Sequence, residues 1–258
     1  MMENKREIGH SINRLPGQSL RERCNEIWDG GACFPFMLWT MGATLFWIEL
    51  THVYGGLKPS IWIGVVPFVV LSVFLVYRVF MVRRSMGRFR QGEKGELIVA
   101  QALQRDLAPL GYVAFHDIPL IKDGRSFNID HLLIGENGIF AIETKNYKKP
   151  RKGRAEVWYD GKSVLWSGKR HKDEDTQAIA VAKDAKKLID ELTGLRVFVT
   201  PVVCAVGWYA KSTDLYGNPV LFCMEKTLKS VIPKVEPRMR LEESDRNKII
   251  SALDRLYL

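Results

Sequence analysis

Two long apolar runs near the start of the chain limit its fold more than any other feature. Residues 32–50 read ACFPFMLWTMGATLFWIEL and residues 61–82 read IWIGVVPFVVLSVFLVYRVFMV, each with a single charge near its end. A helix needs about 20 largely apolar residues to cross a bilayer. Both runs are apolar all round rather than on one face, which favours membrane spans over buried core helices. We therefore predict a two-helix transmembrane hairpin over residues 31–83.

Basic residues flank the outer ends of this hairpin, whereas the ten-residue connection between the runs carries only Lys58. The flanking basic residues are Lys5, Arg6, Arg14, Arg21 and Arg23 before the hairpin, and Arg83, Arg84, Arg88 and Arg90 after it. Short segments rich in Lys and Arg stay in the cytoplasm. We therefore expect a multi-pass membrane protein with both termini cytoplasmic, and we expect the membrane to be a bacterial inner membrane.

The charge of the chain lies almost entirely after the hairpin. Residues 83–258 hold 31 Lys and Arg against 23 Asp and Glu, which is a net charge of +8 out of the total of +9. Such a surplus suits a polyanion, either nucleic acid or an anionic lipid surface, and it also suits a merely solubilising surface. Cys204 and Cys223 lie in apolar runs without metal-ligand spacing, which indicates buried thiols.

Helical and strand patterns alternate through the cytoplasmic part. Helices before, between and after apolar strands predict an α/β fold in which a mixed sheet is covered on both faces. The predicted helices are 95–107, 175–192, 228–232 and 242–256, and the predicted strands are 112–118, 126–135, 139–145, 157–166 (a small hairpin), 197–206 and 220–224.

The predicted strands 126–135 and 139–145 form the strongest hairpin signal in the chain. A two-residue turn at Asn137-Gly138 would pair Asp130 with Lys145, and a four-residue turn would pair Asp130 with Glu143. Either register places Asp130, Glu143 and Lys145 on the same face, because opposed residues and residues two apart share a face. A three-residue turn would break this arrangement.

Two carboxylates and an ammonium group inside an apolar hairpin are costly unless they are paired or bind a metal ion. A hard divalent cation such as Mg²⁺ prefers oxygen ligands of this kind, and it can polarise a phosphodiester. The lysine could orient a water molecule or stabilise charge on the phosphate. A buried salt bridge between Asp130 and Lys145, with Glu143 at its rim, is the alternative interpretation.

The same strings resemble a known family of nucleases. Ile129-Asp130 followed by Glu143-Thr144-Lys145 resembles the core of the PD-(D/E)xK nucleases. More specifically, GEKGELIVAQAL at 92–103 with FNIDHLLIGENGIFAIETKNY at 127–147 resembles the NERD, or nuclease-related, domain over about residues 88–210.

This resemblance implies a restriction-endonuclease-like sheet and a metal-dependent nuclease that hydrolyses DNA in preference to RNA. It implies Mg²⁺ or Mn²⁺ held by Asp130, Glu143 and Glu96, with Glu93 as the weaker match to the helix glutamate. It also adds Gln177 to the catalytic set beside Lys145. The implied organisation is a cytoplasmic segment (1–30), the hairpin (31–83), the nuclease-like domain (84–210) and an α/β extension packed on it (211–258).

A basic segment leaves directly from the predicted site. Residues 145–172 contain ten Lys and Arg, interleaved with Trp158, Tyr159 and Trp166. Basic groups neutralise phosphates and aromatic rings stack on unpaired bases, so this segment is a candidate nucleic-acid contact. It could instead be a solvated loop with rings packed at its base, or it could lie against anionic lipid. The candidate nucleic-acid ligands are Lys148, Lys149, Arg151, Lys152 and Arg154.

The main functional alternative is a protein with the same fold but without catalytic activity. The chain could be a catalytically silent membrane tether or scaffold that binds nucleic acid or a protein partner. A tether has no need of two carboxylates, which repel phosphate when no metal is bound, so the residues favour the nuclease. No phosphate-binding glycine loop, Ser/His/Asp set or zinc pattern is visible, so a nucleotide hydrolase or a protease has no support.

Overall fold

The computed structural model describes residues 15–56, 58, 60, 62–122, 125–171 and 173–256. Three of the basic residues before the hairpin, Lys5, Arg6 and Arg14, lie outside this range. Internal contacts divide the chain into two compact units, which are described separately. One unit is Leu20–Arg90, and the other consists of Met1–Ser19 with Gln91–Leu258.

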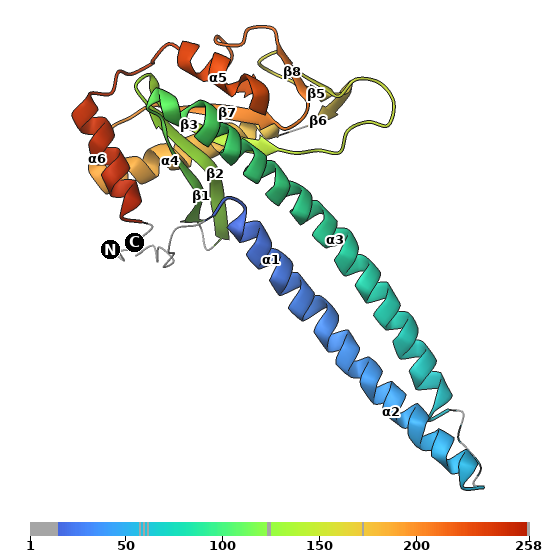
Figure 1. Cartoon of the computed structure of the whole chain (residues 1–258). Helices are drawn as coiled ribbons and strands as arrows, with labels where there is room; N and C mark the ends of the chain where they lie inside the picture. The colour runs from blue at the N-terminus through green and yellow to red at the C-terminus, as the bar shows by residue number, and fades with distance from the viewer. Residues whose placement is uncertain are drawn as a thin grey trace. The chain divides into compact units, whose positions relative to one another are not determined.

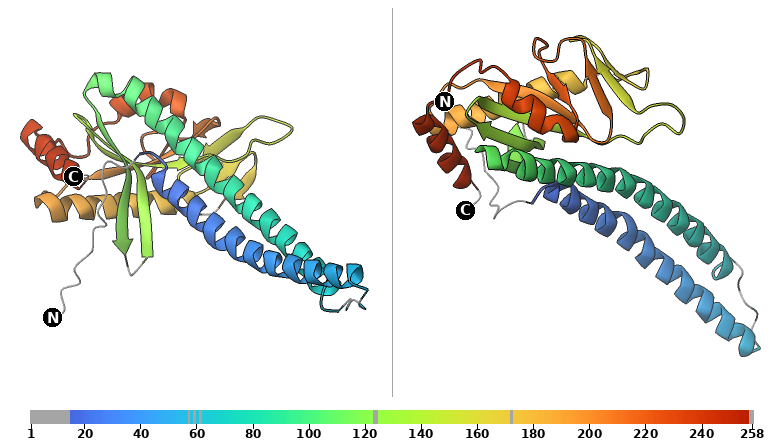
Figure 2. Two further views of the ribbon diagram at one scale, coloured as in Figure 1. Left: turned by 60° about the horizontal axis from the view of Figure 1, so that its bottom comes forward. Right: turned by 45° about the horizontal axis from the view of Figure 1, so that its top comes forward.

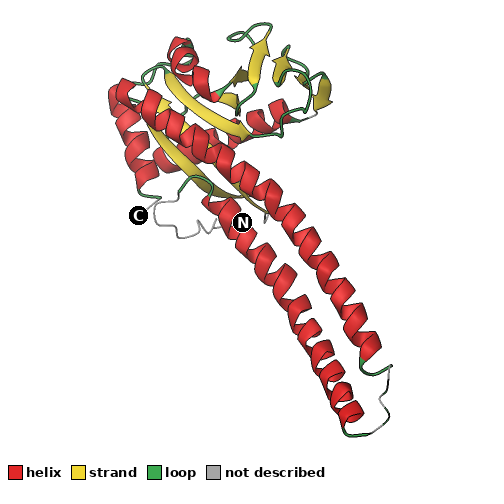
Figure 3. Cartoon of the chain, turned by 45° about the vertical axis from the view of Figure 1, so that its right-hand side comes forward, coloured by secondary structure: helices red, strands yellow, loops and turns green. Residues whose placement is uncertain are grey.

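The first unit is a helical hairpin (Figure 1; Figure 3). Its elements are α1 (Gln18–Trp28), the π-helical turn η1 (Asp29–Cys33), α2 (Phe34–Tyr54) and the first part of α3 (Val65–Asp106). Helical segments at Gln18–Tyr54 and Val65–Leu110 are long and apolar enough to cross a membrane. Their large apolar side chains are mostly exposed, as a lipid-facing surface requires.

Small and polar residues bring the two helices together. At Gly42 an added Cβ would lie 2.8 Å from a methyl group of Leu71, so glycine permits the close approach. The indole Nε1 of Trp39 donates to the hydroxyl of Ser72 at 2.9 Å. At the loop end, a carboxylate oxygen of Glu49 accepts the backbone N–H of Ser60 at 2.8 Å.

The helix boundaries differ from the sequence prediction in one important way. The sequence predicts a span that ends at residue 82 and a separate helix at 95–107, but α3 is continuous over 42 residues. The intervening stretch RRSMGRFRQGEK contains no proline, and its Arg, Gln, Glu and Lys residues are good helix formers that outweigh isolated glycines. Helix α1 was not predicted either.

The second unit is built on a five-stranded mixed sheet of order β1-β2-β3-β7-β9. The first three strands are antiparallel, whereas β3, β7 and β9 run parallel. The strands are β1 (Val113–Lys122), β2 (Arg125–Gly135), β3 (Gly138–Lys145), β7 (Val199–Ala205) and β9 (Leu221–Cys223). The crossover from β3 to β7 contains helix α4 (Glu174–Thr193).

Helices cover both faces of this sheet, as predicted (Figure 2). One core lies between the sheet and α3 with α5 (Leu228–Val231), and it contains Leu103 and Phe140. The other core lies beneath α4 and α6 (Glu243–Asp254), and it contains Ile139 and Ile189. Short 3₁₀ turns complete the unit at Ala108–Leu110 (η2), Glu225–Thr227 (η3) and Ile232–Lys234 (η4).

A second sheet of order β6-β5-β4-β8 was not predicted as such. Its strands are β4 (Glu156–Tyr159), β5 (Val164–Trp166), β6 (Lys169–His171) and β8 (Tyr209–Ser212). The hairpin β4–β5 confirms the predicted hairpin at 157–166, whereas β6 and β8 were missed. The inner face of this sheet packs against β7 and the start of α4 in a third core cluster.

The β2–β3 hairpin has the alternative of the two predicted registers, in which Asp130 lies opposite Glu143, and the register of an Asn137-Gly138 turn is wrong by two residues. Gly135 pairs with Gly138, so the two-residue turn is Glu136-Asn137. Tertiary contacts hold Asn137 at the tip: its Nδ2 donates to the carbonyls of Ile232 and Val235 at 2.7 and 3.2 Å. Because the shift is an even number of residues, the paired side chains between His131 and Ile142 keep their predicted faces. Beyond the ladder the alternation changes, and Ile129 packs in the same core cluster as Leu132.

Candidate active site

The candidate site lies where the β2–β3 ladder ends. The last paired residues are His131 and Ile142, and Asp130 and Glu143 follow immediately on the two strands. The backbone N–H of Thr144 donates to a carboxylate oxygen of Asp130 at 2.7 Å. The Asp130 side chain thus takes the place of a backbone acceptor on the neighbouring strand. Of the two predicted placements of Asp130, the one opposite Glu143 is found, and the one opposite Lys145 is not.

Three predicted residues form a closed set of hydrogen bonds. Glu143 is buried, and its Oε1 accepts from Lys145 Nζ at 2.8 Å and from Gln177 Nε2 at 2.7 Å. Lys145 Nζ also donates to Gln177 Oε1 at 2.8 Å. Gln177 comes from the first turn of α4, which covers the sheet face that carries Glu143 and Lys145.

Glu96 approaches from α3, on the opposite face of the sheet. An added Cβ at Gly95 would lie 2.6 Å from the Cβ of Asn146, so glycine lets the helix approach the end of β3. Gln91 and Asn146 exchange two side chain to backbone hydrogen bonds of 2.6 and 2.7 Å, which fix this approach. Glu96 is consequently buried, with 7% of its surface exposed, whereas Glu93 is only half-buried.

Burial and neighbouring carboxylates raise the pKa values of Glu96 and Asp130. Burial, followed by the charges of Asp117 and Glu143, raises the pKa of Glu96 to about 8, although the backbone N–H of Gly17 opposes the shift. Burial, followed by the charges of Glu143 and Glu96, raises the pKa of Asp130 well above its usual range. The charge of Glu143 therefore acts on both Glu96 and Asp130.

Asp117 is a further buried carboxylate, and it was not predicted from the sequence. It has a φ of +52° in β1, and it accepts both the backbone N–H and the hydroxyl of Ser19, at 2.9 and 2.7 Å. Asn128 on β2 also donates to it. Its signal in the sequence is a single acidic residue within the apolar strand VAFHDIPLIK. It shapes the site by raising the pKa of Glu96.

The donor chemistry of this cluster fits a hard divalent cation. Glu96, Asp130 and Glu143 offer carboxylate oxygens, and their mutual repulsion would be relieved by a cation between them. Within the part of the chain that the structure describes, no group of three or more His, Cys, Asp or Glu side chains is already arranged to hold a metal ion. Glu143 is instead bonded through Oε1 to both Lys145 and Gln177.

The predicted nucleic-acid ligands lie on the segment between β3 and β4. Lys148, Lys149, Arg151, Lys152 and Arg154 are all exposed. Lys149 and Arg154 line a cavity of about 560 Å³ that also borders β8. Of the three interleaved rings, Tyr159 and Trp166 are buried in the third core cluster, whereas Trp158 is exposed.

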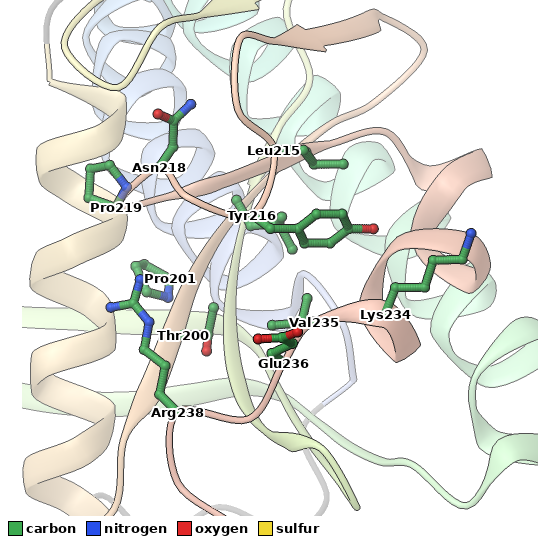
Figure 4. A pocket seen from close by; sticks show the side chains of 11 residues that line it. Thr200, Pro201, Leu215, Tyr216, Asn218, Pro219, Lys234, Val235, Glu236 and Arg238 are labelled. Atoms are coloured by element: carbon green, nitrogen blue, oxygen red, sulfur yellow. The ribbon is translucent and has the colours of Figure 1, made fainter.

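Another cavity, of about 290 Å³, lies apart from these residues (Figure 4). Thr200 and Pro201 at the start of β7 line it, together with Tyr216 from the β8–β9 connection. Lys234 and Arg238 add basic groups from the segment around η4. None of the predicted site residues borders this cavity.

Comparison with known proteins identifies a family over part of the chain. Residues 91–206 match the family described as NERD, nuclease-related domain, so a nuclease-related domain occupies this part of the chain. A Bacillus anthracis protein, described as an uncharacterized protein, is 37% identical over 59 residues, which are 22% of this chain and 27% of that relative. The chain thus spans only about a quarter of that relative's length. No solved structure matches the chain.

Proposed function

We propose that the chain is a membrane-anchored, metal-dependent nuclease-like protein that hydrolyses phosphodiester bonds of DNA. The observation that carries this proposal is the position of Asp130 and Glu143 at the end of the β2–β3 ladder, with Lys145 bonded to Glu143 and Glu96 buried on α3. These residues lie within the part that matches the nuclease-related domain. Their order, spacing and position on paired strands support a restriction-endonuclease-like fold of the PD-(D/E)xK kind.

Each residue has a distinct role in the proposed reaction. Glu96, Asp130 and Glu143 would hold Mg²⁺ or Mn²⁺, which supplies Lewis-acid polarisation of the phosphodiester and a more acidic water. Lys145 would orient the attacking water or stabilise the negative charge that develops on the phosphate. Gln177 keeps the Lys145 ammonium group and the Glu143 carboxylate in position through its two hydrogen bonds.

A catalytically silent tether is the second candidate. The observation in its favour is the closed set formed by Glu143, Lys145 and Gln177, which satisfies the buried charges without a metal ion. Such a protein would use the same domain to bind nucleic acid or a protein partner at the membrane. The two candidates differ in a measurable property, because only the nuclease requires a divalent cation.

The direct test uses the full chain in detergent micelles. Incubation with single-stranded DNA, duplex DNA and RNA is expected to give cleavage of DNA in Mg²⁺ or Mn²⁺ and none in EDTA, because the cation supplies the polarisation on which the reaction depends. Product analysis on denaturing gels measures it. If none of the nucleic acids is cut with either ion, and the chain also binds neither ion, the tether stands in place of the nuclease.

The proposed placement in the membrane has its own test. We propose that α2 and the first part of α3 span a bacterial inner membrane with both chain ends in the cytoplasm. A reporter fused after Leu258 is then expected to be cytoplasmic, and one inserted near Gly55 is expected to be outside. Paired phosphatase and fluorescent-protein reporters measure the two positions. Export of the C-terminal reporter would contradict the orientation.

A further inference from the structure

The second sheet presents an outer face on which side chains from all four strands form a row. In strand order, Arg170 on β6 is opposite Leu165 on β5, Leu165 is opposite Trp158 on β4, and Trp158 is opposite Lys211 on β8. Directly opposed residues share a face. Tyr209 is two residues before Lys211 and therefore lies on the same face. We call these five residues the aromatic platform.

The two rings of the platform are accessible, unlike the other aromatic residues of this sheet. The side chains of Trp158 and Tyr209 are 37% and 53% exposed. Their neighbours on β4 and β5 that point inward, Tyr159 and Trp166, are buried. The inner face of the sheet is therefore packed in the core. The outer face leaves the rings of Trp158 and Tyr209 exposed to water, without apolar side chains packed over them. A ligand with flat apolar surfaces would cover them.

Basic groups surround the platform. The cavity of about 560 Å³ beside β8 is lined by four basic side chains and two carboxylates. Both carboxylates already have partners: Glu156 accepts from Lys211 at 3.1 Å, and Glu225 accepts the N–H of Gly207 at 2.9 Å. Arg170 adds a further exposed cation at the other end of the row. The basic residues of the cavity are Lys149, Arg154, Lys211 and Lys226.

We propose that the aromatic platform binds a single-stranded segment of nucleic acid, with unpaired bases stacked on Trp158 and Tyr209 and phosphates held by the surrounding basic groups. Exposed rings on a sheet and nearby cations are the two features that such binding needs. A duplex keeps its bases stacked on each other and would engage only the cations. Lys211 Nζ lies over the Tyr209 ring, 5.4 Å from its centre, so a cation stands directly beside one of the two rings.

The platform is close to the candidate active site along the chain. Ala205 on β7 pairs with Lys145, and Tyr209 follows Ala205 by four residues. The Cα atoms of Ala205 and Tyr209 are therefore at most roughly 14 Å apart. A single strand bound on the platform could extend to the carboxylates of the candidate active site. Single-stranded nucleic acid is then the substrate class of the proposed nuclease. This assignment of a substrate rests on the proposed function, whereas the binding itself does not.

Binding is measured with the full chain in detergent micelles, in EDTA, by fluorescence anisotropy. The probes are labelled oligothymidine, oligouridine and a DNA duplex. Trp158→Ala and Tyr209→Ala are each expected to weaken binding of the single strands about 5- to 100-fold, because a stacked base is lost. Binding of the duplex is expected to stay unchanged. Tyr209→Phe retains the ring and is expected to bind as the unaltered chain does.

Two further variants separate stacking from charge. Tyr216→Ala removes a similarly exposed ring that lies off the sheet, and it is expected to leave binding unchanged. Replacing the basic loop residues together by alanine is expected to flatten the salt dependence for single strands and duplex alike, because fewer counterions are released. The platform variants are expected to leave that slope unchanged. The loop residues are Lys148, Lys149, Arg151 and Lys152.

Three results would overturn the proposal. The first is equal loss of single-strand and duplex binding in Trp158→Ala and Tyr209→Ala, and the second is no loss in either. The third is a loss of oligonucleotide binding in nanodiscs that contain phosphatidylglycerol but not in neutral ones, which would assign the face to anionic lipid. Because no cleavage is needed, a chain that binds single strands but never cuts them would refute the proposed nuclease and leave the platform intact. Oligothymidine and oligouridine distinguish DNA from RNA.

Discussion

Glu143→Gln in the full chain is expected to lower the rate of DNA cleavage at least about 100-fold, because a metal ion that polarises the phosphate is worth several kcal/mol. The amide keeps the volume of the side chain and can still bond to Gln177, but it lacks the charge that a hard cation requires. Asp130→Asn is expected to act in the same way, since its amide oxygen can still accept the Thr144 N–H. Cleavage assays and calorimetric titration of Mn²⁺ measure the two losses.

The control for these variants is Glu191→Gln, which changes an exposed carboxylate on α4 far along the helix from Gln177. It is expected to leave both ion binding and cleavage unchanged. Thermal melts of each variant establish that the fold is retained. Cleavage by Glu143→Gln at the rate of the unaltered chain would refute the proposed role of this carboxylate, whatever the ion binding shows.

The strand residues of the candidate site could be predicted although the predicted turn was misplaced, because a shift of two residues along a strand does not change the face on which a side chain lies. The turn is Glu136-Asn137 rather than Asn137-Gly138, and tertiary contacts to Asn137 decide this. No local pattern contains those contacts. A shift of two residues nevertheless leaves Glu143 and Lys145 on their predicted face, whereas a shift of one would have reversed every side chain.

The site residues on helices, Glu96 and Gln177, could be predicted only from the resemblance to a known family. Nothing in the periodicity of α3 or α4 singles out Glu96 or Gln177, and the resemblance to the nuclease-related domain supplied both. Asp117 was missed because one acidic residue in an apolar strand has no defined partner until the fold brings Ser19 to it. Strand β8 was missed because four residues with two exposed positions carry too weak an alternation.

The Lys145→Ala variant distinguishes a metal-dependent nuclease from a protein in which Glu143 and Lys145 form only a structural ion pair. The two hypotheses predict different effects of a divalent cation on the stability of this variant. Lys145 is the direct ionic partner of Glu143, and both side chains are largely buried. Without the lysine, the stranded carboxylate is expected to lower the free energy of unfolding by about 3–5 kcal/mol in EDTA. Exposed Lys183→Ala, on the same helix as Gln177, is the control and is expected to have no such effect.

In the metal-dependent reading, Mg²⁺ or Mn²⁺ takes over the neutralising role of the lysine. The Lys145→Ala chain is then expected to bind the ion as tightly as the unaltered chain or more tightly, because a repelling charge is gone. The ion is expected to restore its thermal stability, while cleavage stays abolished for lack of the ammonium group at the phosphate. If Glu143 and Lys145 form only a structural pair, no divalent ion binds and none restores stability. Thermal melts with and without Mn²⁺, beside calorimetric titration, therefore decide between them: a destabilised variant that Mn²⁺ does not rescue contradicts the metal site.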